Sequence, residues 1–275
     1  MRWLIPVCLA LWSTLSPTLP SAEEIEVDVE LLLAVDVSRS MSPAELEIQR
    51  RGYAEALRSD EVIAALQSGL LGQVALSYVE WAGAGAQRIV VDWTLVEDRA
   101  GAEAFAAQLS ANYNPALRRT SISSALSFGW ESLRDNQFVG LRRVIDISGD
   151  GPNNHGGLVT YARDRAVADG IVINGLPLMT EEVPRSPWHL DNLDVYYRTC
   201  VIGGPGSFVI PVTDWAQFAD AVRRKLVLEL VGLTPGPDAA PRPRPVQYIP
   251  GPDDATDCQI GEKIWQRNRG YWGAP

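Results

Sequence analysis

One segment constrains the fold more than any other: Glu30 to Val37 reads ELLLAVDV, an apolar run without regular polar alternation. A strand buried on both faces of a parallel sheet has this pattern, because helices cover both of its faces. The run leads directly into a polar sequence, D-V-S-R-S, from Asp36 to Ser40. The segment therefore predicts a central strand whose carboxyl end carries polar side chains.

Strand and helix patterns alternate along the chain that follows. Ser42 to Glu45 supplies an N-cap serine, a proline at the first helical position and a glutamate three residues after the cap, so a helix is expected to about Arg58. This alternation predicts an α/β fold: a doubly wound, mostly parallel sheet with one antiparallel edge strand and helices on both faces. The other expected elements are a hairpin of Val74–Trp81 and Arg88–Trp93, helices at about 98–110 and 121–134, a strand at Arg143–Ser148, a helix ending near Gly170, strands at Ile171–Leu176 and Ser207–Val212, and a helix to about Leu230 that begins in a capping box of Asp214 and Gln217.

Residues 1–22 have the order of a secretory signal peptide: Arg2, then the apolar run from Trp3 to Trp12, then small residues around Ala22. A spanning helix is not favoured, because it needs about 20 apolar residues and Pro6 interrupts this shorter run. We therefore expect a periplasmic or secreted protein with no integral membrane segment after removal of the signal.

The remaining chain divides into three parts. Residues 23–232 hold the predicted domain, 233–253 form a proline-rich linker, and 254–275 form a short C-terminal segment whose aromatic residues could dock onto the domain. Cys200 and Cys258 are the cysteines left after signal removal; they could be two buried thiols, but an oxidising compartment permits a disulfide, which we expect. That bond would tie the C-terminal segment to the domain.

The net charge of the chain limits the classes of partner that it can bind. A formal net charge of −10 and a pI near 4.8 oppose binding to nucleic acid or to an anionic bilayer by charge, since those partners attract basic surfaces. The sequence has no C-x-x-C and no Cys/His cluster with zinc spacing. An acidic protein of this kind is suited to attracting cations through oxygen ligands.

Three polar motifs fall at predicted strand ends or facing helix starts. They are the D-x-S-x-S of Asp36, Ser38 and Ser40, the threonine Thr120 opening a helix in RRTSISSAL, and Asp150 within Gly-Asp-Gly after a strand. Carboxyl ends of parallel strands lie at one edge of the sheet, so the three loops can converge there.

In this order the motifs resemble the metal-ion-dependent adhesion site (MIDAS) of von Willebrand factor type A (vWA) domains, over roughly residues 30–231. The resemblance implies that Asp36, Ser38, Ser40, Thr120 and Asp150 bind one divalent cation. Carboxylate, hydroxyl and water oxygens suit Mg²⁺, Mn²⁺ or Ca²⁺. It also implies an adhesion-type protein-binding module, not an enzyme, whose partner presents an acidic residue to the metal.

The phrases YVEWAGAG, RRTSIS, DISGDGPNN and CVIGGPG are more closely similar to an exported bacterial family of unknown function, DUF1194. One departure from the adhesion-type pattern is Gly149, which precedes Asp150 where a threonine is common. The polar loop from Gly151 to Asn154 is a second departure. Coordination through this loop is therefore expected to differ from that of adhesion-type domains.

Two alternatives remain. Asp36 and the GDGPNN sequence also resemble motifs of Mg-dependent phosphatases of the haloacid-dehalogenase type, but Ser38 stands where that chemistry needs an acid/base aspartate, and the first lysine of the chain is Lys225. Alternatively, the domain is structural and its metal site is vacant, because a single D-x-S-x-S or a lone threonine commonly caps backbone amides in turns. The coincidence of three motifs in order favours the metal-binding interpretation.

Overall fold

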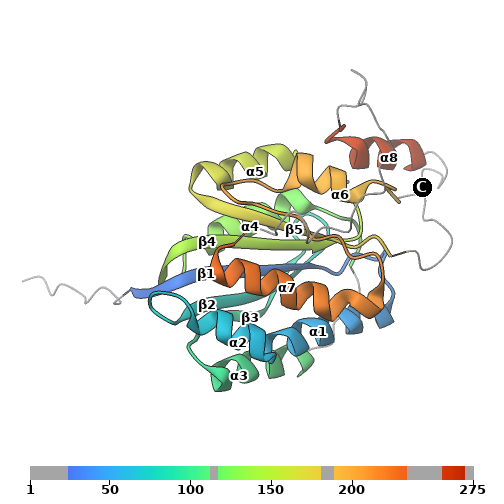
Figure 1. The fold of residues 1–275 in the computed structure, drawn as a ribbon. Helices are drawn as coiled ribbons and strands as arrows, with labels where there is room; N and C mark the ends of the chain where they lie inside the picture. The colour runs from blue at the N-terminus through green and yellow to red at the C-terminus, as the bar shows by residue number, and fades with distance from the viewer. Residues whose placement is uncertain (1–23, 112–116, 181–188, 234–255, 270–275) are drawn as a thin grey trace, which may run out of the picture.

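The computed structural model describes residues 24–111, 117–180, 189–233 and 256–269. Five strands form one sheet in the order β3-β2-β1-β4-β5, in which only the β2–β3 pair is antiparallel (Figure 1). The expected sheet, mostly parallel with one antiparallel edge strand, is thus confirmed. The strands are β1 (Ile25–Asp36), β2 (Val74–Trp81), β3 (Gln87–Val96), β4 (Phe138–Gly149) and β5 (Ile171–Pro177).

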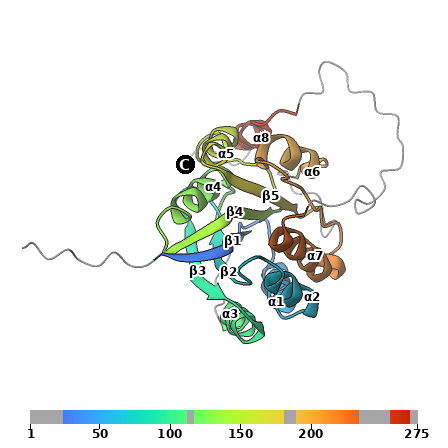
Figure 2. The same cartoon turned by 60° about the vertical axis from the view of Figure 1, so that its left-hand side comes forward.

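Helices cover both faces of the sheet, which confirms the doubly wound arrangement (Figure 2). Among the described residues, no helix has the length and apolar character needed to cross a bilayer. One face carries α1 (Pro43–Leu57), α2 (Asp60–Gln67), α3 (Arg99–Ala111) and α7 (Phe218–Val231), and the other carries α4 (Ile122–Ser132), α5 (Val159–Ala168), α6 (Leu193–Tyr196) and the turn Tyr197–Val201.

The central strand β1 is longer than its apolar run. Every residue from Val27 to Asp36 is buried, including the acidic Asp28 and Glu30. Their carboxylates accept backbone hydrogen bonds, Asp28 from Leu71 and Glu30 from Gly140. Buried acids are tolerated when they are hydrogen-bonded, so acidic residues before the apolar run hid the first five residues of this strand.

Two capping boxes were expected at helix starts, and one of them is present. The capping box of α1 is present: Ser42 donates its amide proton to Glu45 at 2.6 Å, and the Ser42 hydroxyl accepts from the Glu45 amide at 3.3 Å. The predicted capping box at Asp214 is wrong, because its side chain accepts from the Ala216 amide and caps a 3-10 turn that precedes α7.

The expected strand at Ser207–Val212 is also not a regular strand. This segment meets β5 only through isolated bridges at Val209 and Val212. The Ile210 and Val212 amides donate to the Gly175 and Pro177 carbonyls at 3.0 and 2.9 Å. Pro177 has no amide proton to return a bond between these two, so the ladder is interrupted there.

A buried ionic cluster links α7 to the sheet. The Lys225 ammonium lies 2.6 Å from Oδ1 of Asp146 on β4 and also pairs with Glu229 on α7. Glu229 accepts a further hydrogen bond from Asn174 of β5 at 2.9 Å. Burial, and next the charge of Asp146, raise the pKa of Glu229 to about 7, against the opposing effects of Lys225 and Asn174. Lys225 is therefore the shared counterion of two buried carboxyl groups.

Candidate metal site

The register of the sheet brings the first and third motifs together. β1 and β4 are parallel neighbours, with Val35 opposite Ser148, so Asp36 and Asp150 follow adjacent strand ends. The segment before α4 lies against the same edge, because the Leu117 amide donates to the Val37 carbonyl at 2.9 Å. The sheet thus gathers all three loops at its carboxyl edge, as expected for a doubly wound fold.

Four of the five predicted site residues form a chain of hydrogen bonds. Oδ1 of Asp36 accepts from the Ser38 amide at 2.7 Å, the Ser38 and Ser40 hydroxyls lie 2.9 Å apart, and the Ser40 hydroxyl donates to Oδ1 of Asp150 at 2.9 Å. Asp36 and Ser38 are buried, Ser40 is exposed and Asp150 is half-buried. The cluster therefore runs from the end of β1 outward to the surface.

Thr120 lies in the third loop but differs from its expected local role. Ser121, and not Thr120, is the N-cap of α4; its hydroxyl accepts from the Ser124 amide at 3.3 Å. Thr120 is the buried residue before the cap, and its amide and carbonyl both bond to Asn154. Within the described part of the chain, no hydrogen bond joins the Thr120 side chain to the other four residues.

The acidic groups of the cluster have the electrostatics of a cation site. Burial, and next the charge of Asp150, raise the pKa of Asp36 well above its ordinary value. Burial also raises the pKa of Asp150 to about 6, against the hydrogen bond from Ser40. Oδ2 of Asp36 is buried and, among the described residues, has no hydrogen-bond partner. A cation would satisfy this oxygen and offset the burial of both carboxylates.

The donor set decides which cations fit. The candidate site consists of two carboxylates, Asp36 and Asp150, and the neighbouring hydroxyls. Among the described residues, no group of three or more His, Cys, Asp and Glu side chains is arranged to hold a metal. Oxygen donors of this kind fit Mg²⁺, Mn²⁺ or Ca²⁺, of which Mg²⁺ commonly keeps several waters. The residues present therefore fit a hydrated divalent cation.

Gly149 and Tyr197 are neighbours of the site that sequence reasoning did not assign to it. A Cβ atom on Gly149 would lie 2.8 Å from the Tyr197 hydroxyl and 2.9 Å from Oδ2 of Asp36. The glycine therefore leaves space for both oxygen atoms beside the end of β4. Gly149 stands where adhesion-type domains commonly have a threonine, and this close packing is the physical reason for the glycine.

Asn153 and Asn154 join the loop after Asp150 to the start of α4. Oδ1 of Asn153 accepts from the Ser123 amide at 3.0 Å, and Oδ1 of Asn154 accepts from the Thr120 amide at 3.0 Å. The asparagines are thus loop-forming residues. They also fix two loops of the candidate site relative to each other.

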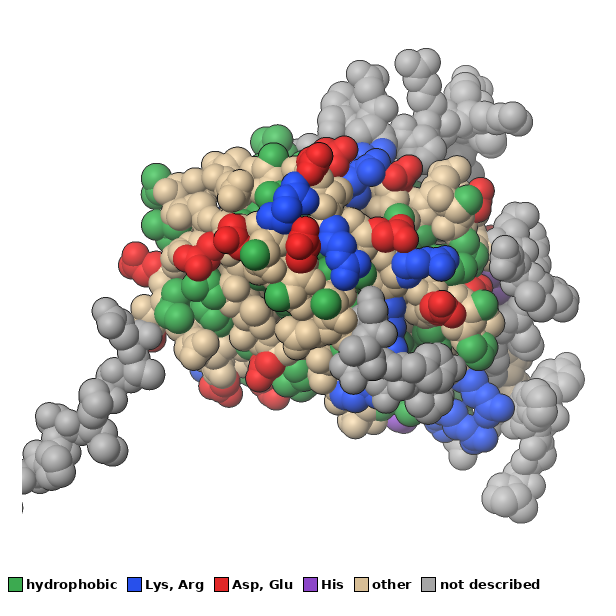
Figure 3. Space-filling view, turned by 90° about the horizontal axis from the view of Figure 1, so that it is seen from below, with side chains coloured by type: hydrophobic (Ala, Val, Ile, Leu, Met, Phe, Trp, Pro, Cys, Tyr) green, Lys and Arg blue, Asp and Glu red, His purple; other side chains and the backbone are tan. Residues whose placement is uncertain are grey.

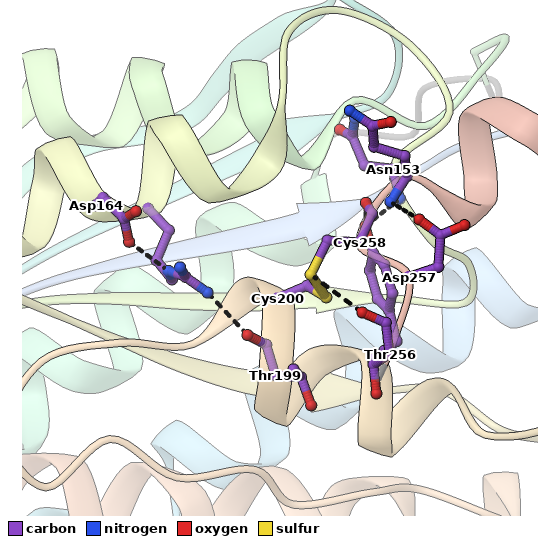
Figure 4. The surroundings of a disulfide bond; sticks show 10 residues. Asn153, Asp164, Thr199, Cys200, Thr256, Asp257 and Cys258 are labelled. Carbon is purple, nitrogen blue, oxygen red and sulfur yellow. Dashed lines mark hydrogen bonds and ion pairs between the residues drawn. A yellow bond between two sulfur atoms is a disulfide. The ribbon is translucent and has the colours of Figure 1, made fainter. Parts of the chain in front are cut away.

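The disulfide expected between Cys200 and Cys258 is present, with 5.4 Å between the Cα atoms (Figure 4). Asn153 lies in the same surroundings, because its amide donates to the Tyr196 hydroxyl at 3.2 Å, and that hydroxyl contacts the Cys258 carbonyl. The bond places the C-terminal segment beside the loop that follows Asp150. The expected signal peptide and most of the expected linker lie outside the described residues.

Comparison with known proteins is informative at the level of family and fold. Residues 26–234 match the sequence profile of the family described as "Protein of unknown function (DUF1194)". A search of curated proteins gave no match.

Solved structures share the fold at low sequence identity. Proximal thread matrix protein 1 from the mussel byssus has a TM-score of 0.52 at 14% identity, over 76% of this chain and 49% of its own. A second structure of that protein, with a zinc-occupied MIDAS motif, has a TM-score of 0.50 at 14% identity and the same coverage. The pilus adhesin SpaC from Lactobacillus rhamnosus GG has a TM-score of 0.52 at 15% identity, over 74% of this chain and 30% of its own. The chain spans about half or less of the length of these proteins, and the likeness shows a common vWA-like fold.

Proposed function

The chain belongs to the DUF1194 family, and from this premise we propose that it is an exported, metal-dependent protein-binding module of the adhesion type and not an enzyme. The site consists of Asp36, Ser38, Ser40, Thr120 and Asp150 at the carboxyl edge of a vWA-like sheet. One divalent cation, Mg²⁺ or alternatively Mn²⁺ or Ca²⁺, would bind there. The partner is a protein that presents an acidic residue to the metal.

One observation carries this proposal. Within the described part of the chain, Oδ2 of Asp36 is buried without a hydrogen-bond partner, beside a hydrogen-bonded chain of hydroxyls that ends at Asp150 and opens to the surface at Ser40. A buried carboxylate oxygen without a partner is costly in free energy unless a ligand satisfies it. The comparisons add support, since the byssus protein has a MIDAS motif that binds zinc and SpaC is an adhesin.

The residues have distinct tasks in this proposal. Asp36 and Asp150 supply negative charge, and Ser38, Ser40 and Thr120 supply hydroxyl oxygens, directly or through water. When bound, the cation supplies a positive charge that can accept a carboxylate oxygen from outside the chain. Ser40 is exposed and Asp150 half-buried, so an acidic side chain would approach from their side of the cluster.

The phosphatase alternative lacks its cationic group. The chain has two lysines, Lys225 and Lys263. Lys225 is buried between Asp146 and Glu229, and Lys263 pairs with Asp257 at 2.7 Å. Each lysine is therefore engaged with carboxylates other than Asp36 and Asp150, and Ser38 provides no carboxylate for acid/base chemistry.

Calorimetry with Mn²⁺ tests the metal site. We expect the wild-type protein to bind one ion weakly, because only two carboxylates supply charge, and Asp36→Ala to abolish binding without unfolding the domain. Asp135→Ala is the matched control, since Asp135 is exposed at the end of α4 and should leave the affinity unchanged. Equal affinity in wild type and Asp36→Ala would overturn the assignment and favour a structural domain with a vacant site.

Capture of proteins from an envelope extract tests the use of the site. Binding of the partner should require a divalent ion and should be lost with Ser38→Ala/Ser40→Ala and with Asp150→Ala. Mutating the acidic residues of a captured protein then identifies the group that meets the metal. A partner that survives chelation and these substitutions unchanged would place the binding surface elsewhere.

The disulfide supports the proposed periplasmic or secreted location, because such bonds persist in oxidising compartments. We propose cleavage after Ala22, which leaves the 23–232 domain, the 233–253 linker and the 254–275 segment in the mature chain. N-terminal sequencing of protein recovered outside the cytoplasm should begin at about Glu23. Recovery of Met1 would remove the argument for a cleaved signal.

A further inference from the structure

We propose that the C-terminal helix α8 (Ile260–Arg269) is a brace that positions two loops of the metal site, and that the Cys200–Cys258 disulfide keeps it in place. The inference rests on the proposed function of that site. α8 lies at the end of the sheet where β1 and β4 end (Figure 1). Glu262 and Trp265 are the positioning residues.

The first contact joins α8 to the loop after Asp150. Oε1 of Glu262 accepts a hydrogen bond from Nδ2 of Asn153 at 2.6 Å. A Cβ atom on Gly261 would lie only 2.0 Å from the Asn153 carbonyl oxygen, so the helix backbone packs directly against the loop backbone. A residue larger than glycine would therefore force the helix away from this loop.

Asn153 connects α8 to the start of α4 through hydrogen bonds. It is fully buried, and while Nδ2 donates to Glu262 and to the Gly157 carbonyl, Oδ1 accepts from the Ser123 amide. The adjacent Asn154 bonds to both the amide and the carbonyl of Thr120. A shift of α8 would thus reach the loops that carry Asp150 and Thr120 through a continuous set of hydrogen bonds.

The second contact reaches the Thr120 loop directly. The Arg119 guanidinium carbon lies 4.4 Å from the centroid of the Trp265 ring, an arrangement that attracts a cation to an aromatic face. Arg119 has a φ of 73°, in the left-handed region that side-chain-bearing residues rarely adopt. The stacking helps to hold Arg119 in this conformation, immediately before Thr120.

The disulfide explains how so short a helix stays docked. Cys258 precedes α8 by two residues and bonds to Cys200, a buried residue of the turn after α6. The Cys258 carbonyl also contacts the Tyr196 hydroxyl, which accepts from the Asn153 amide. The covalent bond therefore fixes the start of α8 next to the loop that the helix contacts, which raises its effective concentration there.

The test compares five variants of the full chain by Mn²⁺ calorimetry. Glu262→Ala, Trp265→Ala and Cys200→Ala/Cys258→Ala should each weaken Mn²⁺ binding at least threefold, whereas the exposed Gln266→Ala should not. Glu262→Gln should restore the affinity, because its amide oxygen can still accept from Asn153. A purely structural role would lower the melting temperature and leave the affinity of the folded protein unchanged.

Hydrogen exchange at the Thr120 and Asn154 amides, measured without ion, separates failure of the brace from failure of the metal site. If wild type binds Mn²⁺, wild-type affinity in Glu262→Ala, Trp265→Ala and Cys200→Ala/Cys258→Ala overturns the brace. If wild type does not bind Mn²⁺, the proposed function fails and exchange decides: faster exchange in Glu262→Ala and Trp265→Ala supports the brace, and unchanged exchange overturns it.

Discussion

The Ser40 hydroxyl donates a hydrogen bond to Oδ1 of Asp150 at 2.9 Å, and so joins two loops that lie 110 residues apart in the sequence. The bond is on the outer, exposed side of the cluster, whereas Asp36 lies at its buried end. The two loops thus already converge through side-chain contacts of their own. A preformed arrangement of ligands reduces the ordering that ion binding would require.

Ser40→Ala should therefore weaken Mn²⁺ binding roughly tenfold, equivalent to about 1.4 kcal/mol, because it removes one oxygen and the link to Asp150. The free energy of unfolding should change by no more than about 0.5 kcal/mol, since Ser40 is exposed. Ser40→Thr keeps the hydroxyl and serves as the control. Calorimetry and urea unfolding measure the two quantities, and unchanged ion affinity in Ser40→Ala would contradict the prediction.

Gly149→Ala and Gly151→Ala form a matched pair two residues apart. A Cβ on Gly149 would crowd Tyr197 and Asp36, whereas one on Gly151 meets nothing within 4 Å. We expect Gly149→Ala to lower the free energy of unfolding by about 1–3 kcal/mol and to weaken Mn²⁺ binding, because it displaces Oδ2 of Asp36. Gly151→Ala should change neither strongly. Equal effects of the two substitutions would show that crowding at Gly149 is not limiting.

The two lysines allow a comparison of a buried and an exposed ion pair. Lys225→Met should lower the free energy of unfolding by about 3–5 kcal/mol, because Asp146 and Glu229 lose their buried counterion. Lys263→Met should cost less than about 1 kcal/mol, since its pair with Asp257 is partly exposed. Chemical denaturation of both variants measures the difference. A similarly small loss of unfolding free energy in both variants would mean that Asp146 and Glu229 are protonated in Lys225→Met and need no counterion.

Glu229 should make stability depend on pH in a defined direction. Its pKa is raised from 4.5 to about 7 in the folded protein, so the folded state holds the proton more tightly than the unfolded state. Its contribution is therefore complete below about pH 4.5 and is lost as pH rises through about 7, by up to about 3 kcal/mol.

In Glu229→Gln the free energy of unfolding should fall less as pH rises. Subtracting the unfolding free energy of this variant from that of wild type leaves the contribution of Glu229, because the other carboxyl groups with a raised pKa are present in both proteins. Urea unfolding between pH 4.5 and 8 provides the measurement. Parallel pH profiles for the two proteins would be inconsistent with the assignment.

Much of the fold follows from local sequence because each main element carries its own signal. The apolar run before Asp36 predicts a central strand, and Ser42 with Glu45 predicts the start of α1. The short α2 was missed, although Ser59 caps it in the same manner as other helix starts. Pattern reasoning fails where isolated bridges replace a strand at Val209, since long-range contacts decide the pairing there.

The residue types of the candidate site could be predicted from the sequence, whereas the residues that support it could not. Asp36, Ser38, Ser40 and Asp150 stand out because carboxylates and hydroxyls follow strand ends. Tyr197 carries no such signal: it lies in a turn after α6, its ring packs at Gly175, and its hydroxyl lies at Gly149 beside Oδ2 of Asp36. The contact between Glu262 and Asn153 spans 109 residues and depends on a disulfide whose geometry no spacing rule specifies.

The direction of β1 has a practical consequence for presentation of the protein on a surface. Ile25 begins this strand and Asp36 ends it, so the start of the folded domain lies at the opposite end of the sheet from the loops of the proposed metal site (Figure 1). At about 3.3 Å per residue, the twelve-residue strand holds the two ends roughly 40 Å apart. The face of α1, α2 and α3 seen from below carries acidic and basic side chains interspersed (Figure 3). Immobilising the chain through its N-terminal side would therefore leave the edge with the proposed ion site pointing outward and open to solution, which is the orientation that a sensor chip or affinity bead requires.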